Sequence, residues 1–390
     1  MLALSPFWAL LIVGPVVYWR LPPRWRSAFL ATISVGFLGW LAPVATLALL
    51  GWTALVLWAA PRAKTASRPL VVTGALVIAL VGYLLGAKYL PELVDGVAGT
   101  DLSARYVVPL GVSYFVFKLV HYAIEVGRGR IDAHTPSDVL AWATLFPAFV
   151  AGPIERFDHF LQHRSVSIDE TVVAWSFARI AIGLVKKLLV GDVVLAELTT
   201  APFEADLALP AWSTADAWFH VCVHFLRGYA DFSGYTDIAI GASRLFGIRL
   251  MENFDWPLFA PDLNAFWKRW HMTLAGWCQI YIYPPTLGLT RNPYVAVYSV
   301  FVVMALWHGL SLNWIFWGLW HGSGVAALLT WNRVKRRRGW HKTLKIPNWA
   351  GTVPTLAFVC AAGAFTSTHE LGAGPAIRLF AKLFFVDVAP

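Results

Sequence analysis

Long apolar stretches alternate with short charged turns along most of this chain. By length, an apolar stretch of roughly 20 residues can cross a bilayer as a helix, and shorter stretches indicate re-entrant pieces. These rules predict an all-α protein with about ten to twelve transmembrane or re-entrant helices. The clearest expected helices are Ser5–Trp19, Ser27–Ala42, Pro43–Ala60, Leu70–Leu90, Tyr106–Val126, Glu170–Val190, Trp212–Tyr229, Pro293–Trp307, Leu312–Trp331, Trp349–Thr366 and the short Ala376–Phe385.

The charged turns between the spans predict their orientation. Basic turns (Arg20–Arg26 and Pro61–Arg68) alternate with a loop that carries Glu92 and Asp95. Cytoplasmic loops are enriched in Lys and Arg, so we expect the basic turns in the cytoplasm and the N-terminus outside. The most basic loop, Asn332–Pro347, is expected to be cytoplasmic as well. The first span lacks a charged leader and a cleavage site, so we expect it to be retained.

Two stretches in the middle of the chain break this pattern. Val139–Val150 is too short to span comfortably and runs into Ala151-Gly152-Pro153, which predicts a re-entrant element covered by protein or water. Asp231 and Asp237 flank a Ser-Gly-Tyr sequence ahead of the apolar Ile238–Phe246. We expect a helix start there, because a carboxylate at that position caps backbone N–H groups.

Composition agrees with a membrane protein. Of the 390 residues, 58% are hydrophobic and 14% are charged, and the mean hydropathy is +0.60. A soluble domain is about 25% charged. We therefore predict one integral membrane domain over residues 1–390. Cytoplasmic basic loops explain the net charge of +9, and no nucleic-acid partner is expected. The three cysteines are far apart and predict neither a disulfide framework nor a metal site.

A charged cluster interrupts the apolar sequence at Phe266–His271, which reads Phe-Trp-Lys-Arg-Trp-His. Charges at membrane depth are costly and usually face a protein interior or a water-filled cavity. Lys268 and Arg269 are equally compatible with cations that extend to the cytoplasmic surface. A second histidine, His308, lies in a Trp-His-Gly turn, where it fits either an interfacial or a chemical role.

Four ordered motifs carry a resemblance: residues 228–241 (GYADFSGYTDIAIG), 252–257 (ENFDWP), 266–271 (FWKRWH) and 306–309 (LWHG). Residues 109–114 (PLGVSY) and 146–154 (FPAFVAGPI) add to it. Together they resemble the membrane-bound O-acyltransferase (MBOAT) family, and within it the bacterial branch of alginate O-acetylation subunits and teichoic acid D-alanyl transferases. The resemblance runs from about residue 109 to residue 322.

The resemblance implies transfer of an acyl group from a cytoplasmic thioester to a hydroxyl group outside the cell. His308 then corresponds to the family's catalytic histidine, and His271 to its usual partner in a central tunnel formed by the helices. It also implies a multi-pass protein of the bacterial inner membrane, surrounded by lipid. The donor is expected to be acetyl-CoA or an acyl carrier protein, with no bound cofactor and no metal. The acceptor is a glycan, reached directly or through an extracytoplasmic second acyltransferase or carrier protein.

The chemistry of the residues agrees with this role. Attack on a thioester needs a base near neutrality, which histidine supplies, and the developing oxyanion needs hydrogen-bond donors. The candidate catalytic residues are His308 and His271. The candidate substrate-binding residues are Trp267, Lys268, Arg269, Trp270, Asn253, Asp237, Tyr281, Trp307 and His321.

Several alternatives stay open at this point. His321 fits packing as well as function, and His220 with His224, one turn apart, fits a polar stripe or a metal pair. Gln279-Ile280 stand where the bacterial relatives carry an Arg-Asp pair, which leaves the role of that pair in doubt. The transferred group is expected to be acetyl, with D-alanyl as an alternative. A protein that exports glycans or lipids without chemistry is the alternative of another class.

Overall fold

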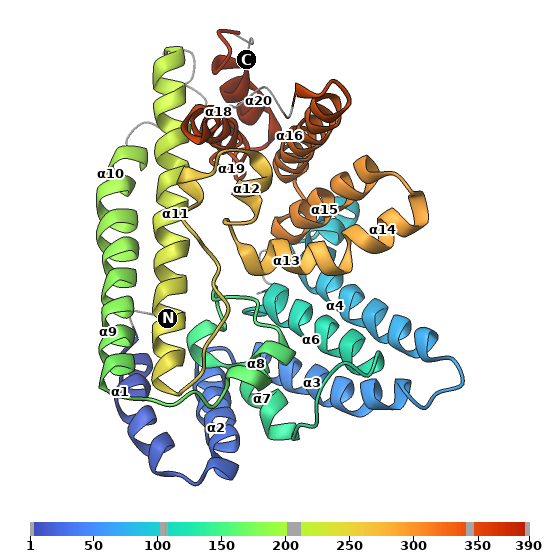
Figure 1. Ribbon diagram of the computed structural model, residues 1–390, viewed down its shortest axis with the longest axis vertical. Helices are drawn as coiled ribbons and strands as arrows, with labels where there is room; N and C mark the ends of the chain where they lie inside the picture. Colours follow the sequence, from blue (N-terminus) through green and yellow to red (C-terminus); the bar gives the residue numbers. More distant parts are fainter. Residues whose placement is uncertain (1–3, 102–105, 107, 201–211, 341–346, 387–390) are drawn as a thin grey trace. The chain divides into compact units, whose positions relative to one another are not determined.

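The computed structural model describes residues 4–101, 106, 108–200, 212–340 and 347–386. Within these ranges the chain forms helices and no β-strand (Figure 1). The chain divides into two compact units: unit 1 comprises Met1–Gly183 with Tyr235–Met251, and unit 2 comprises Leu184–Gly234 with Glu252–Pro390.

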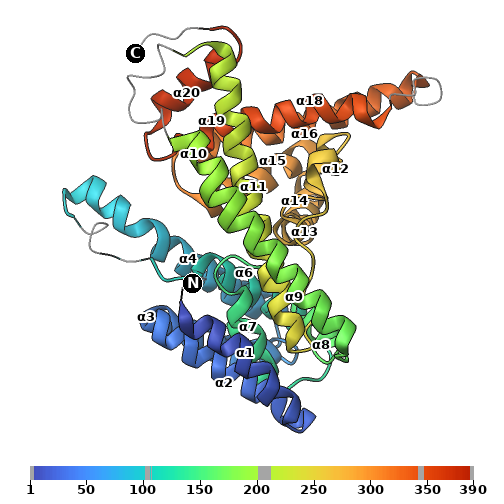
Figure 2. The ribbon, with the colours of Figure 1, turned by 90° about the vertical axis from the view of Figure 1, so that its left-hand side faces the viewer.

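The N-terminal part of unit 1 is a group of long apolar helices. Three of them begin at a proline, which fits a first helical turn because proline has no N–H to leave unpaired. Each helix packs on the next one along the chain, α1 on α2, α2 on α3 and α3 on α4, and α6 packs on both α3 and α4. Figure 2 shows α1, α2 and α3 side by side. Their bounds are α1 Ser5–Arg20, α2 Pro23–Leu41, α3 Pro43–Ala63, α4 Pro69–Ala98 and α6 Val112–Gly127.

These helices confirm the predicted break at Pro43 and change two predicted boundaries. The helix expected over Tyr106–Val126 begins only at Val112. Gly111 precedes it with φ 72°, and a Cβ there would lie 2.7 Å from the Phe149 ring. Glycine is suited to both constraints. The helix expected over Leu70–Leu90 extends to Ala98.

The short middle elements of unit 1 are tied together by polar contacts. They are α7 Pro136–Thr144, the 3-10 turn η1 Phe146–Ala148 and α8 Phe157–His163. Thr135 and Asp138 form a capping box at the start of α7. After η1 the chain is held by Glu155: its carbonyl accepts from Trp142 Nε1 at 3.0 Å, and its carboxylate accepts from the Met251 backbone N–H at 2.8 Å. These bonds satisfy backbone that no regular helix would pair.

The helix start predicted at Asp231–Asp237 is wrong, because α11 runs without a break from Thr214 to Leu245. Distant cations compensate both carboxylates. In unit 1 Arg179 Nε donates to Asp237 Oδ1 at 2.9 Å, and in unit 2 Lys187 pairs with Asp231. Arg179 lies on α9 (Glu170–Leu184), which continues directly into a π-helix, η2 (Val185–Val194), and α10 (Leu195–Thr200).

Unit 2 is a second group of helices joined by short turns. Its main contacts are α15 with α16, α14 with α15, and α16 with α12 and α19. Gly318 on α16 permits the first of these, because a Cβ there would lie 2.8 Å from the Phe301 carbonyl oxygen of α15. The elements are η4 Pro257–Phe259, α12 Leu263–Trp267, α13 Met272–Tyr281, α14 Tyr283–Thr290, α15 Pro293–His308, α16 Leu312–Arg337, α18 Asn348–Ala361, α19 Gly363–Thr366 and α20 Ala373–Lys382.

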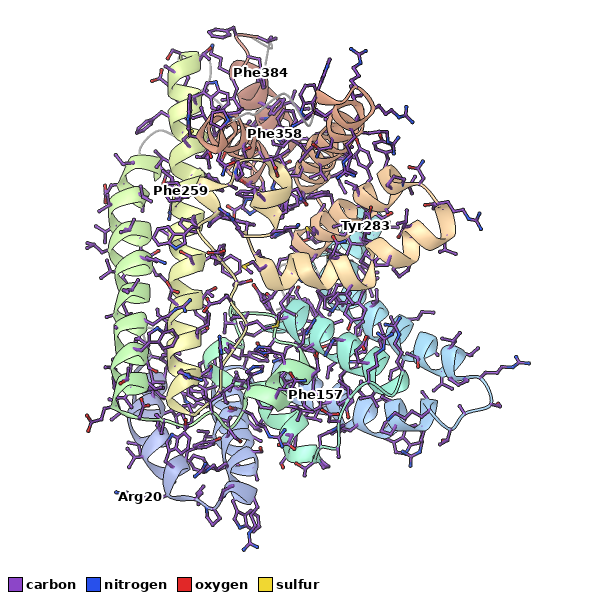
Figure 3. The ribbon with its side chains drawn as sticks, viewed as in Figure 1. Arg20, Phe157, Phe259, Tyr283, Phe358 and Phe384 are labelled. Atoms are coloured by element: carbon purple, nitrogen blue, oxygen red, sulfur yellow. The ribbon has the colours of Figure 1, made fainter. Side chains whose placement is uncertain are left out.

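Three helical stretches among the described residues are long and apolar enough to cross a membrane: Pro43–Ala63, Pro69–Ala98 and Asn348–Thr366. The helix Pro293–His308 is apolar but shorter. The all-helical prediction is thus confirmed, whereas the count of ten to twelve spans is not. Large apolar side chains cover outer surfaces, as on α4, where Leu70 is 87% and Ile78 is 73% exposed (Figure 3 shows the side chains). Lipid would cover such side chains in a bilayer.

Removing one partner of the Arg179–Asp237 pair should destabilise unit 1. We expect Asp237→Ala to cost about 1–3 kcal/mol, because it removes a carboxylate that pairs with a largely buried guanidinium at 2.9 Å. Replacing both residues with leucine should restore most of the loss, since it removes both charges together. The midpoint of thermal unfolding of the detergent-purified variants measures the effect. A double variant that is less stable than Asp237→Ala would contradict this explanation.

Candidate active site

The site is built around His271, the residue before the first turn of α13. Its backbone is left-handed, with φ 42° and ψ 52°, a conformation that a residue with a Cβ rarely adopts. Two backbone bonds hold the turn in place: the Met272 N–H donates to the Asn253 carbonyl at 2.9 Å, and the Asp255 N–H donates to the Arg269 carbonyl at 2.9 Å. The strained conformation is thus fixed by the segment that contains Asn253.

The side chain of Asn253 fixes the tautomer of His271. Asn253 Oδ1 lies 3.0 Å from His271 Nδ1 and accepts from Thr273 Oγ1 at 2.8 Å and from the Thr273 backbone N–H at 3.2 Å. A backbone N–H can only donate, so the atom it contacts is the amide oxygen. His271 Nδ1 therefore carries the proton. Nε2 keeps a lone pair, is buried, and has no hydrogen-bond partner among the described residues.

His308 is the last residue of α15. Its ring stacks on Trp314, with centroids 4.3 Å apart and planes inclined by 9°, and meets Trp317 edge-on at 5.4 Å. Gly309 makes this stack possible, because a Cβ at that position would lie 2.6 Å from the Trp314 ring. Two residues of α16 thus hold the ring of His308.

His271 and His308 open into the same cavity, of about 240 Å³. Trp307 contacts both histidines: its ring centroid lies 5.8 Å from that of His271 and 4.7 Å from that of His308. The cavity is mostly aromatic, and its walls also include His224, Phe232, Trp267, Trp270, Trp314, Trp317, His321 and Thr366.

Of the other predicted residues, Trp267, Trp270 and His321 line this cavity. His321 is 2% exposed, and its ring meets Trp267 edge-on at 5.0 Å. Its Nδ1 is buried without a hydrogen-bond partner in the described part of the chain.

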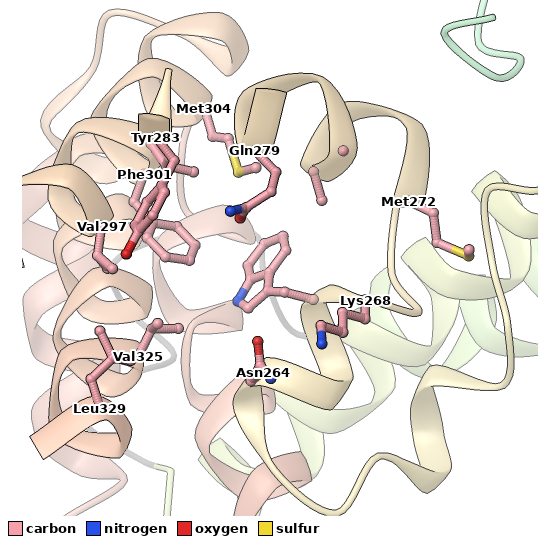
Figure 4. A pocket seen from close by; sticks show the side chains of 14 residues that line it. Asn264, Lys268, Met272, Gln279, Tyr283, Val297, Phe301, Met304, Val325 and Leu329 are labelled. Carbon is pink, nitrogen blue, oxygen red and sulfur yellow. The ribbon is translucent and has the colours of Figure 1, made fainter. Parts of the chain in front are cut away.

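A larger cavity of about 580 Å³ lies beside α13, α15 and α16. Lys268, Asn264, Gln279 and Tyr283 supply its polar groups, and apolar side chains of α15 and α16 supply much of the remainder (Figure 4). Gln279 thus offers this cavity a neutral amide.

The structure does not bring the remaining predicted residues to either cavity. Asp237 belongs to unit 1, where it pairs with Arg179. Arg269 lines neither cavity. Tyr281 ends α13 and packs on Trp277 with the ring centroids 5.0 Å apart.

His224 and Thr366 also line this cavity, although the sequence motifs did not predict them there. His224 Nε2 lies 3.1 Å from Thr366 Oγ1, and both side chains line the cavity. Their separation in the sequence hides this pairing.

Among the described residues, no group of three or more His, Cys, Asp and Glu side chains is arranged to hold a metal ion.

Fold and site together define a helical, membrane-type protein with two histidines in one aromatic cavity. A family model described as the membrane-bound O-acyltransferase family matches residues 24–353. The chain belongs to the membrane-bound O-acyltransferase family, and the resemblance drawn from the sequence motifs is confirmed.

Individual relatives agree with this assignment. The chain is 31% identical to the probable alginate O-acetylase AlgI of Pseudomonas aeruginosa over 329 residues, which is 80% of this chain and 62% of AlgI. It is 29% identical to the peptidoglycan O-acetyltransferase of Helicobacter pylori, over 62% of this chain and 51% of that protein. It is 28% identical to the teichoic acid D-alanyltransferase of Streptococcus thermophilus, over 58% of each chain. The chain thus spans less than two thirds of the AlgI sequence.

Asn253 should be required to hold His271. We expect Asn253→Leu to lower stability by about 1–3 kcal/mol, because it removes the buried oxygen that accepts from His271 Nδ1–H and from Thr273. Asn253→Asp keeps an acceptor oxygen at the same place and should lose less. Thermal unfolding of the purified variants tests this order. Equal losses for both variants would show that the amide oxygen does not hold the turn.

Proposed function

We propose that this protein transfers an acyl group, acetyl in the first instance, from a thioester to a hydroxyl group of a cell-envelope or secreted polysaccharide. The observation that carries the proposal is the pair of imidazoles that open into one cavity of about 240 Å³; Nε2 of one of them, His271, has no hydrogen-bond partner among the described residues. Histidine is the side chain suited to accept a hydroxyl proton near neutral pH.

His308 is the base in this proposal. It is partly exposed, whereas His271 is 4% exposed, so an acceptor that enters the cavity reaches His308 first. The stack on Trp314 limits rotation of its ring. Asn253 holds the Nδ1 proton of His271, so His271 Nε2 is a second acceptor in the cavity. In this proposal, Nε2 is a further site that can accept the proton taken from the hydroxyl group.

The larger cavity is the place we assign to the donor. It combines a cation, two amides and a phenol with an apolar wall, and it shares Trp267 with the histidine cavity. A thioester donor such as acetyl-CoA or a loaded acyl carrier protein has this mixture of polar and apolar parts. The donor enters from the cytoplasm, and the acceptor is a glycan outside the bacterial inner membrane.

The names of the relatives support acetyl as the transferred group: alginate O-acetylase and peptidoglycan O-acetyltransferase. The teichoic acid D-alanyltransferases support D-alanyl as the second candidate. We further propose that an extracytoplasmic second acyltransferase or a carrier protein works with this chain.

His308→Ala should abolish acyl transfer while the protein stays folded. We expect a loss of at least about 10²-fold in rate, the lower end of what general-base catalysis contributes. Transfer of labelled acetyl in membranes measures it. His163→Ala is a matched control, because His163 lies at the end of α8 and bonds a backbone carbonyl of that helix. Full activity of His308→Ala would overturn the assignment.

The donor can be identified by its label. Membranes that contain the protein should transfer radioactive acetyl from acetyl-CoA or an acetylated carrier protein to polysaccharide, and the His308→Ala membranes should not. Transfer of labelled D-alanine instead would establish the second candidate. Glycan that is moved across the membrane but never esterified would support an exporter.

A further inference from the structure

Trp267 occupies a distinctive position between the two cavities. Its side chain lines both the cavity of about 240 Å³ that holds His271 and His308 and the cavity of about 580 Å³ that we assign to the donor. A donor in the larger cavity and an acceptor beside His308 would therefore meet at this indole.

The indole N–H of Trp267 is buried and has no hydrogen-bond partner in the described part of the chain. Leaving a buried donor unpaired is costly, and such groups in native structures call for a specific explanation. The ring is held edge-on by Phe301 at 5.1 Å, His321 at 5.0 Å and Trp317 at 5.9 Å. These contacts keep the N–H from turning towards another partner.

We propose that Trp267 is a catalytic residue whose indole N–H donates to the carbonyl oxygen of the thioester and to the oxyanion that forms from it. The inference rests on the proposed acyl transfer. Donors that are fixed before the reaction, in a site with little water, stabilise developing charge most effectively. An indole N–H can only donate, and a donor is what a carbonyl oxygen or an oxyanion requires.

Other candidate donors fit this role less well. Lys268 is exposed and lines only the larger cavity. Arg269 lines neither cavity, and the same holds for Asn253, whose Nδ2 is buried without a partner. Among the candidate substrate-binding residues, Trp267 is the one that lines both cavities and has a buried N–H with no hydrogen-bond partner in the described part of the chain.

The acceptor hydroxyl oxygen attacks the thioester carbonyl carbon, and its proton passes to His308. The C–O bond forms, and the π electrons of the carbonyl move onto its oxygen, which accepts from Trp267 Nε1–H. Collapse of this intermediate breaks the C–S bond, and the proton leaves His308 with the departing thiolate. The products are the ester and a free thiol.

The test is Trp267→Phe, which keeps an aromatic ring and removes the N–H. We expect kcat to fall about 10²- to 10³-fold, as for the loss of one oxyanion donor, with KM for the donor changed by less than about 3-fold. Replacement of Trp267 by 3-benzothienylalanine, which keeps the bicyclic shape and lacks the N–H, should give the same loss and covers the case in which Phe disturbs folding.

Trp320→Phe is the matched control. Trp320 also lies in unit 2, its N–H donates to the Phe358 carbonyl at 2.9 Å, and it lines neither cavity. We expect this variant to lower thermal stability and leave kcat near that of the wild type.

A donor whose carbonyl oxygen is replaced by sulfur separates a catalytic from a merely structural role, because sulfur is a weak acceptor. The wild type should be slowed strongly by this dithioester, and Trp267→Phe should be slowed much less. An active wild type with an equally active Trp267→Phe, or equal slowing of both proteins by the dithioester, overturns this inference alone. A wild type that transfers no acyl group from any thioester overturns the proposed function and this inference with it.

Discussion

The site depends on one amide oxygen. Asn253 Oδ1 receives three donors, two from Thr273 and one from His271. These bonds replace the water that the groups would bind in an unfolded chain, and a buried hydrogen bond is costly to lose. The same oxygen holds the left-handed turn before α13 and decides which nitrogen of His271 bears the proton. One oxygen therefore sets both the backbone conformation at His271 and the tautomer of its imidazole.

Charges elsewhere in the chain follow a similar logic. Asp237 and Asp231 lie in the interior of a long helix, and each has a cation from the helix that precedes it in the sequence. Pairing offsets much of the cost of removing a charge from water. These aspartates thus serve helix packing. Trp267, His271 and His321, which line the histidine cavity, each have a buried polar atom with no hydrogen-bond partner in the described part of the chain.

The sequence predicted the helical class from its apolar stretches and the two key histidines from their motifs, and the structure places His271 and His308 in one cavity. It did not reveal how Asn253 holds His271, because no local pattern shows that Thr273 and His271, about 20 residues later, donate to its side chain. The continuity of α11 was also missed, since it depends on cations more than 40 residues away in the sequence. The stack of Trp314 on His308 comes from the next helix and leaves no local signal.

The left-handed backbone at His271 also limits how this position can evolve. Glycine, asparagine and aspartate tolerate that conformation, whereas β-branched residues rarely adopt it. Selection on the chemistry of the ring therefore acts on a set of side chains already reduced by the backbone. A descendant that lost the imidazole without losing the turn would be confined largely to a short amide, a short acid or no side chain. The backbone geometry of this segment therefore restricts which replacements of the imidazole keep the turn.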